Sequence, residues 1–230
     1  MKASKLFIIG ILGTMIFLFS CTAVFITEIS RVENFNLKYV NKKTATVVAL
    51  EDVRQGLFYN KFDGKYPQKN DFVANYTSQF AHKLKKAIIF SQVNLDTTHN
   101  WSVLKTGSIS KKSFKLQDSL LKSCGSDYLI CISEFEVSNH IQADKIGMAY
   151  NTTEYCVVSA HFQILDVNSH YYMLDFISSG EGIVILSAYD SALEEAINSS
   201  VRHAVAFMKT GNKRFIIHTT QLPTNIPIRF

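Results

Sequence analysis

A long uncharged segment near the N-terminus sets the strongest constraint on this chain. Lys2 and Lys5 precede a run from Leu6 to Phe19 that contains no charged residue. A basic start followed by an apolar run is typical of a secretory signal segment, which is removed from the mature protein. The sequence therefore predicts that residues 1–20 take no part in the fold, and that the folded domain lies outside the cytoplasm.

The end of this run resembles a bacterial lipobox. Leu18 stands three residues before Cys21, and the small residue Ser20 directly precedes it. By this resemblance Cys21 would be acylated, would become the first residue of the mature chain and would hold the protein on the membrane. Thr22 rather than an aspartate follows Cys21. By resemblance to proteobacterial sorting, this favours a cell-envelope protein anchored in the outer membrane and facing the periplasm.

An uncleaved anchor helix is the alternative for the same segment. The stretch from Leu6 to Ile26 has no charge and is about as long as a helix that crosses a membrane. The apolar run continues past Cys21 through Ala23, Val24, Phe25 and Ile26, which favours this alternative. Both interpretations place the domain on a membrane and outside the cytoplasm.

The composition excludes several classes of protein. Apolar residues make up 47% of the 230 residues and charged residues 19%, which excludes a disordered chain and permits a large core. Cleavage before Cys21 would remove Lys2, Lys5 and no acid, so the net charge would fall from +5 to +3. That charge is too small to indicate nucleic-acid binding, and we expect no nucleic-acid partner.

Hydrophobic patterning predicts one domain over residues 44–219, after a lipidated lead-in over 21–43 and before a tail over 220–230. The fold class is α/β (α+β), a single mixed and mainly antiparallel sheet with about three helices packed on it. A polar loop is expected over 140–153. Strands are expected at 44–50, 92–95, 128–132, 156–164, 172–176 and 214–219, the fourth and fifth as a hairpin, and helices at 70–90, 109–124 and 187–209. The pattern alternates from Ser133 onward, so the strand at 128–132 is expected to extend beyond the cover of the helices.

A short motif stands where the second helix is expected to lead into a central strand. It runs from Cys124 to Ile130 and reads Cys-Gly-Ser-Asp-Tyr-Leu-Ile. Together with the hairpin and the closing alanine-rich helix, it resembles the curli-secretion and penicillin-binding-protein-activator lipoproteins. It is also similar to the auxiliary lipoproteins of ABC-type lipid transport systems. The resemblance covers about residues 44–209 and implies a membrane-tethered accessory protein without a catalytic residue.

Catalytic and metal-binding motifs are absent from the sequence. It contains no C-x-x-C, no G-x-S-x-G, no phosphate-binding loop and no histidine pair at metal-ligand spacing. We therefore expect no enzyme activity, no metal and no cofactor. A nucleophilic pair of Cys131 with His161 is conceivable but disfavoured. Cys131 and Cys156 could form a disulfide on neighbouring strands, although buried and reduced thiols are favoured.

Two groups of side chains are candidates for contact with other molecules. The loop over 53–70 carries Phe58, Tyr59, Phe62 and Tyr66, which either bind a partner protein or fold back to plug the edge of the core. Lysines cluster on two expected helices and are interpreted as solvated, with anionic lipid headgroups as the alternative contact. These are Lys83, Lys85 and Lys86, and Lys111, Lys112 and Lys115.

These observations together predict a non-enzymatic, membrane-tethered envelope lipoprotein. Its expected role is that of an accessory or binding subunit for an envelope protein complex or transport system. The alternative is a carrier domain that binds a lipid or a small apolar ligand between helix and sheet. The sequence leaves the oligomeric state open.

Overall fold

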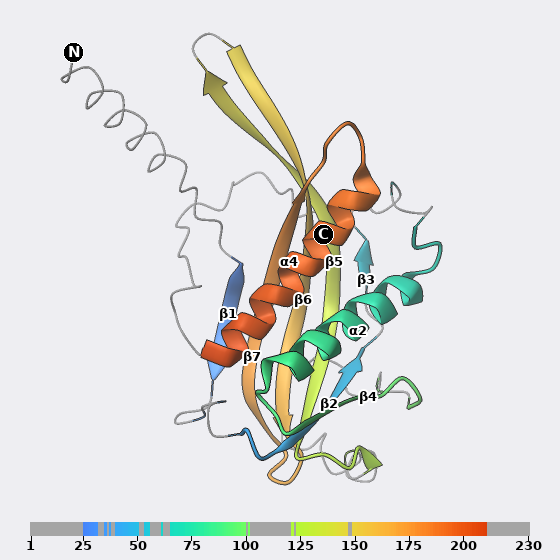
Figure 1. Ribbon diagram of the computed structural model, residues 1–230, viewed down its shortest axis with the longest axis vertical. Coiled ribbons are helices and arrows are strands. Elements are labelled where there is room, and N and C mark those ends of the chain that lie inside the picture. Colours follow the sequence, from blue (N-terminus) through green and yellow to red (C-terminus); the bar gives the residue numbers. More distant parts are fainter. Residues whose placement is uncertain are drawn as a thin grey trace, which may run out of the picture.

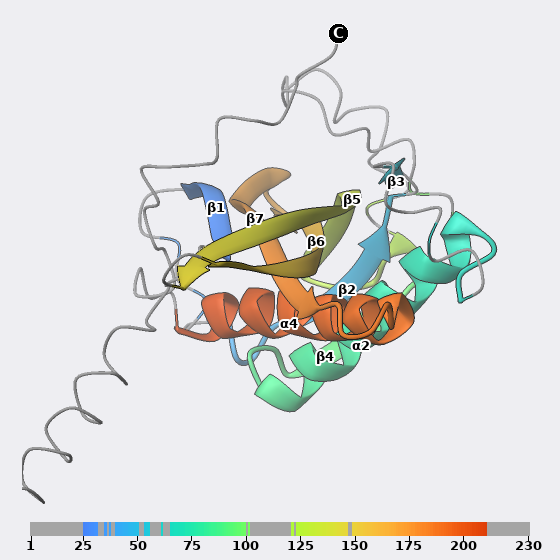
Figure 2. The ribbon, with the colours of Figure 1, turned by 90° about the horizontal axis from the view of Figure 1, so that it is seen from above.

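One mixed sheet, covered on one face by two helices, forms the body of the protein (Figures 1 and 2). The computed structural model describes residues 25–31, 35, 37, 40–50, 53–55, 61, 65–99, 101, 121, 123–146 and 149–210. The predicted mixed, mainly antiparallel α/β fold is confirmed. The described residues contain two helices rather than the expected three, because most of the helix expected at 109–124 lies outside them.

The sheet has an antiparallel half and a parallel half. Its strand order is β1-β7-β6-β5-β2-β4, and β3 also pairs with β5. The neighbouring pairs β1–β7, β7–β6 and β6–β5 are antiparallel. The pairs β5–β2, β2–β4 and β3–β5 are parallel. The strands are β1 (Ile26–Arg31), β2 (Thr44–Ala49), β3 (Val53–Gln55), β4 (Gln92–Leu95), β5 (Tyr128–Ile146), β6 (Ala149–Asp166) and β7 (Tyr171–Ile183).

The expected central strand is confirmed as the first part of β5, which lies between β2 and β6. A bulge interrupts β5 between Ser133 and Glu136, and Glu134 there has a positive φ of 48°. The parallel partners change at the same place: β2 pairs with β5 before the bulge and β3 pairs with it after the bulge. The bulge therefore divides β5 into two differently supported parts.

Helices α2 (Lys69–Ala87) and α4 (Tyr189–Thr210) pack on one face of the sheet through their apolar stripes. Tyr76 and Phe80 of α2 lie against Phe162 of β6, and Tyr76 also meets Phe135 edge to face at 5.3 Å between ring centroids. A smaller apolar cluster, which includes Val48, Leu129, Leu165 and Trp101, lies on the opposite face at one end.

The structure differs from the expected element plan in three places. Residues 140–153, expected as a polar loop, belong largely to a long β5–β6 hairpin that extends beyond the helices (Figure 1). Strand β1 lies in the expected lead-in, and β3 lies in the expected loop over 53–70. The strand expected at 214–219 and the tail fall outside the described residues.

Candidate functional site

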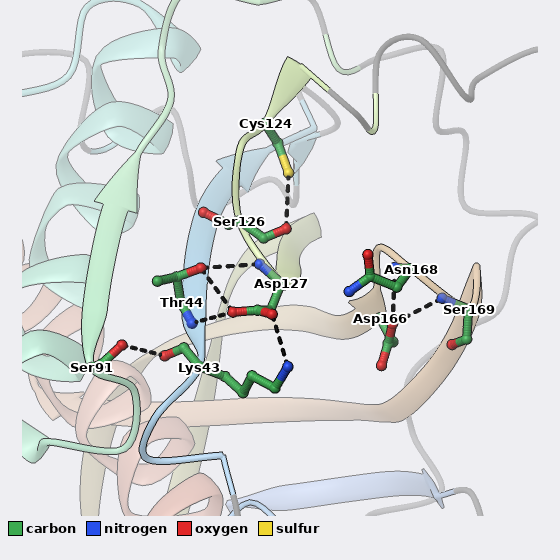
Figure 3. A network of polar contacts seen from close by, with 9 residues as sticks. All are labelled: Lys43, Thr44, Ser91, Cys124, Ser126, Asp127, Asp166, Asn168 and Ser169. Carbon is green, nitrogen blue, oxygen red and sulfur yellow. Dashed lines mark hydrogen bonds and ion pairs between the residues drawn. The ribbon is translucent and has the colours of Figure 1, made fainter.

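Asp127, from the motif singled out in the sequence, lies at the centre of a polar network (Figure 3). Its carboxylate accepts hydrogen bonds from the Thr44 backbone N–H at 2.9 Å and from the Thr44 hydroxyl at 3.1 Å. Lys43 forms an ion pair with the same carboxylate at 3.0 Å. In return, the backbone N–H of Asp127 donates to Thr44 Oγ1 at 3.0 Å. These bonds join the starts of β2 and β5.

The remaining polar contacts of this region also hold backbone segments in place. Thr46 and Ser126 share a buried hydrogen bond of 2.7 Å between their hydroxyls. Asp166 accepts hydrogen bonds from the backbone N–H groups of Asn168 and Ser169, each at 2.9 Å, and so shapes the β6–β7 turn (Figure 3). The hydrogen bond from Thr44, the ion pair with Lys43 and the hydroxyl contact hold the pKa of Asp127 below its usual value. The motif therefore holds the starts of β2 and β5 together.

A second polar cluster lies on the sheet face that the helices do not cover. His161 Nε2 and Asp175 Oδ1 are 2.5 Å apart, and Gln163 donates to the other oxygen of Asp175 at 2.9 Å. Glu134 lies 4.0 Å from His161 Nδ1. Burial alone would lower the pKa of His161, but the hydrogen bond and the negative charges of Asp175 and Glu134 outweigh it, so the pKa is raised.

The same cluster contains buried polar atoms that have no hydrogen-bond partner among the described residues. These are Ser133 Oγ, Gln163 Oε1 and His161 Nδ1. Cys131 lies on this face too, since it pairs with Gln163. Burial raises the pKa of the Cys131 thiol to about 12, so the thiol stays protonated near neutral pH. The arrangement therefore disfavours the nucleophilic pair of Cys131 with His161, because the thiolate is the nucleophilic form.

Sequence reasoning identified His161 but missed Asp175. The two are brought together by the hairpin register, in which Asp175 pairs with Gln163, two residues along β6 from His161. Residues 167–170 form the turn between the two strands. A register irregularity between Ile164 and Leu165 shifts this pairing, so counting outward from the turn would have placed Asp175 opposite Phe162, on the other face of the sheet from His161.

The cysteines are reduced in this structure. Cys124, Cys131 and Cys156 are free, so the disulfide considered between Cys131 and Cys156 is not formed. Their strands are neighbours, as expected, but Cys131 pairs with Gln163 whereas Cys156 pairs with Asn139. The two thiols also belong to apolar clusters on opposite faces of the sheet. Burial of reduced thiols, the favoured alternative, agrees with this geometry.

Of the four aromatic partner-contact candidates, Tyr66 is the one that lies in the described residues. Tyr66 is buried, packs edge to face on Phe72 at 5.7 Å and hydrogen-bonds to Glu194. It therefore closes the core edge and offers no free surface. Phe58, Tyr59 and Phe62, like the lipidation candidate Cys21, lie outside the described residues.

Exposed apolar side chains instead surround the base of the β5–β6 hairpin. Leu186 and Ile185 follow the end of β7 and are 98% and 64% exposed, and Ile141 of β5 is 64% exposed. The backbone ties these segments together, because the Val184 N–H donates to the Glu154 carbonyl and Ile141 pairs with Glu154. We call Ile141, Ile185 and Leu186 the arm-base surface; Ile183 pairs with Tyr155, next to Glu154, and so points to the other face of the sheet. Exposed apolar residues that cluster in this way are typical of contact sites.

The described residues contain neither a metal cluster nor a membrane-spanning helix. No group of three or more His, Cys, Asp or Glu side chains there is arranged to hold a metal ion. Neither of the helices in that part of the chain is both long and apolar enough to cross a membrane.

The chain is similar to several solved structures. No family model matches it, and neither does any curated protein. The PelC dodecamer from Paraburkholderia phytofirmans is similar at a TM-score of 0.44 and 12% identity, over 80% of this chain and 98% of that one.

Bacterial lipoproteins are among the similar structures. Lipoprotein GNA1162 from Neisseria meningitidis has a TM-score of 0.34 and 11% identity, over 61% of this chain and 83% of that one. A minor lipoprotein from Acinetobacter baumannii has a TM-score of 0.32 and 8% identity, over 72% and 93%. Likenesses at this level transfer no function. The resemblance to curli-secretion, penicillin-binding-protein-activator or transport-auxiliary lipoproteins stays a prediction.

Proposed function

We propose that this chain is a lipoprotein of the bacterial cell envelope, anchored through Cys21 in the outer membrane and facing the periplasm. Its domain acts as a non-enzymatic accessory or binding subunit for an envelope protein complex or transport system. One observation carries the proposal: the lipobox-like run ends at Cys21, four residues before Phe25, where the described domain begins. A lipid on Cys21 would therefore hold a folded domain directly at the membrane surface.

The position of Ile26 supports lipidation over an anchor helix. Ile26 is fully buried, and it pairs with Ser178 of β7. The apolar run past Cys21 was the sequence feature that favoured a spanning helix. Ile26, the last residue of that run, packs in the domain core. The fold of the domain therefore explains why the run continues past Cys21.

The polar clusters support a binding role rather than catalysis. The Asp127 network joins two strand starts, and the His161–Asp175 pair joins β6 to β7. The cysteines of the described domain are reduced, and burial raises the pKa of both Cys131 and Cys156 to about 12. The arm-base surface is the part of the described domain that we assign to the partner protein, since it exposes large apolar side chains together.

Detergent phase partitioning of the protein expressed in a Gram-negative host tests the anchor. The native chain is expected in the detergent phase, and a Cys21→Ser variant is expected to stay unprocessed, with its signal segment attached. Cys124→Ser is the matched control, because Cys124 is a half-buried free thiol of the domain. Cleavage of Cys21→Ser at the native position, with unchanged partitioning, would contradict the proposal.

Crosslinking in intact cells tests the binding role. Leu186→Ser is expected to reduce the yield of a defined crosslinked envelope partner severalfold while leaving the thermal unfolding midpoint unchanged. Ile88→Ser is the matched control. Ile88 is also highly exposed, at 78%, and it directly follows the last residue of α2. Equal crosslinking of the Leu186→Ser, Ile88→Ser and native chains would contradict the assignment of the arm-base surface.

A further inference from the structure

The charges of α2 and α4 are divided along the helices. Acidic residues lie in the first halves, at Asp71 of α2 and at Asp190, Glu194 and Glu195 of α4. From Phe80 of α2 and from Ala196 of α4 to the helix ends there is no acidic residue. The C-terminal halves instead carry Lys83, Lys85, Lys86, Arg202 and Lys209, which we call the basic surface.

These cationic side chains come together because the two helices run side by side in the same direction (Figures 1 and 2). Gln79 of α2 contacts Glu194 of α4, and one turn further on Lys83 donates to the Asn198 carbonyl at 3.2 Å. Burial and the nearby positive charge of Arg202 lower the pKa of Lys83. The basic surface therefore contains like charges that repel each other.

The helix dipole explains only part of this arrangement. A lysine in the last turn is favourable beside the negative end of a helix, and this covers Lys85, Lys86 and Lys209. Lys83 and Arg202 lie earlier in their helices, and the like-charge repulsion between them is unfavourable on its own. An anionic surface placed over both helices would remove that cost.

The start of the domain lies beside the same part of α4. The Phe25 ring stacks on the His203 ring, with centroids 3.9 Å apart and planes at 23°. The Phe25 carbonyl accepts a hydrogen bond of 2.7 Å from the Ser179 N–H. His203 directly follows Arg202 in the sequence. Phe25 is therefore held next to the basic surface.

The chain between Phe25 and the lipidation candidate is short. Cys21 lies four residues before Phe25, and four extended residues span at most about 14 Å. The membrane carrying the lipid must then lie close to the Phe25 side of the domain. Surface charges act over a Debye length of about 8 Å at physiological salt. Glu28 of β1 is a nearby acid, and its charge acts on His161, on the other face of the sheet.

We propose that the basic surface of α2 and α4 lies against anionic lipid headgroups of the membrane that anchors the chain. This inference rests on the proposed anchor at Cys21. It sets the orientation of the domain: the C-terminal ends of α2 and α4 face the membrane, and the β5–β6 hairpin points away from it (Figure 1).

Amine footprinting of the purified lipidated chain in vesicles tests this orientation. One set of vesicles contains phosphatidylcholine alone, and the other an equal mixture of phosphatidylcholine and phosphatidylglycerol. Labelling of Lys85 and Lys86 is expected to fall about fivefold in the anionic vesicles, the factor that corresponds to ~1 kcal/mol per basic side chain at such a surface. Salt at about 1 M should abolish the difference, because it shortens the Debye length to about 3 Å.

Lys69 is the internal control for the footprint. It is exposed at the first residue of α2, about 25 Å along the helix from Lys86 at 1.5 Å per residue. Its labelling should be the same in both vesicles. A Lys85→Glu/Lys86→Glu variant is expected to lose the lipid-dependent protection of Lys83 and Lys209, whereas Lys69→Glu should retain it.

Flotation separates the two ways in which the idea can fail. A chain that floats with the neutral vesicles and shows equal lysine labelling in both sets would overturn the orientation and leave the anchor intact. A chain that does not float with neutral vesicles would overturn the anchor, and the orientation with it.

Discussion

The side chain of Asp127 joins two strand starts that are far apart in the sequence. Its carboxylate accepts the Thr44 backbone N–H and hydroxyl, and pairs with Lys43. In this way one acidic residue fixes where the parallel pairing of β2 with β5 begins. Hydrogen bonds to an ionised carboxylate are stronger than neutral ones, so the loss of this group should be measurable in stability.

Asp127→Ala is expected to lower the free energy of unfolding by about 1–3 kcal/mol, because the Thr44 N–H and hydroxyl lose a charged acceptor. Urea unfolding measures the change. Lys43→Met is the control and should have little effect, since the Lys43 side chain is half exposed, at 50%. An Asp127→Ala chain as stable as the native one would show that the network does not hold β2 in place.

The two polar clusters should give opposite dependences of stability on pH. The pKa of Asp127 is lowered, so its contribution is present above the unfolded value of about 3.9 and is lost as pH falls through the folded pKa. The pKa of His161 is raised, so its contribution is complete below about 6.5 and is lost as pH rises through the folded pKa.

The His161 contribution is measurable by chemical unfolding at pH 5.5 and pH 8.5. The native chain should lose stability between these values relative to a His161→Asn variant, in which residue 161 no longer titrates. NMR titration of His161 should give a pKa above the ordinary histidine value of about 6.5. Parallel stability profiles of the native and His161→Asn chains would contradict the pairing with Asp175.

At the scale of elements, α4 can lie on β7 only because β7 carries glycine at two positions. A Cβ at Gly180 would overlap the Ser200 backbone N, and one at Gly182 would overlap the Ala192 carbonyl O. Neither contact is the end of a flexible side chain, so the helix itself would have to move. These glycines serve the close approach of two backbones.

Gly182→Ala is expected to lower the free energy of unfolding by about 3 kcal/mol or more, because overpacking here shifts a helix backbone. Gly125→Asn is the matched control. Gly125 has a positive φ of 61° but no atom within 4 Å of an added Cβ, and asparagine tolerates that conformation. Thermal unfolding of both variants measures the contrast. Equal losses of stability would contradict the requirement for glycine where α4 approaches β7.

The sequence predicted elements well where one face meets the core. The hairpin of β6 and β7 and the helices at 70–90 and 187–209 showed clear periodicity, and the structure confirms them. The strand at 128–132 was predicted from an apolar run without alternation, and it is buried on both faces. Residues 140–153 were wrongly interpreted as a loop because that part of the β5–β6 hairpin lies beyond the helices (Figure 1). A strand without a buried face lacks the alternation that identifies it.

Strand β1 and the candidate sites were harder to predict for a related reason. A register irregularity between Thr27 and Ser30 breaks the alternation of β1. The motif around Asp127 was found, but its role depends on contacts with Thr44, which is 83 residues away. The arm-base surface could not be predicted, because the exposure of Leu186 follows from the way β7 turns into α4.

At the scale of the whole molecule, the membrane side and the partner side are at opposite ends. Phe25 and the basic surface lie toward the C-terminal end of α4. The arm-base surface lies toward its N-terminal end, where Tyr189 of α4 donates to Glu154 at the base of the hairpin. A chain anchored through Cys21 would thus present the β5–β6 hairpin and the arm-base surface to the periplasm.

The mass of the mature N-terminal peptide, taken from the membrane fraction of expressing cells, tests the proposed anchor most directly. We predict a chain that begins at Cys21 and carries the added mass of a diacylglyceryl group and an amide-linked acyl chain. The same peptide from a Cys21→Ser chain should be missing. An unmodified peptide that still begins at Met1 in the native protein would contradict the lipoprotein assignment, and the orientation inferred for α2 and α4 would fall with it.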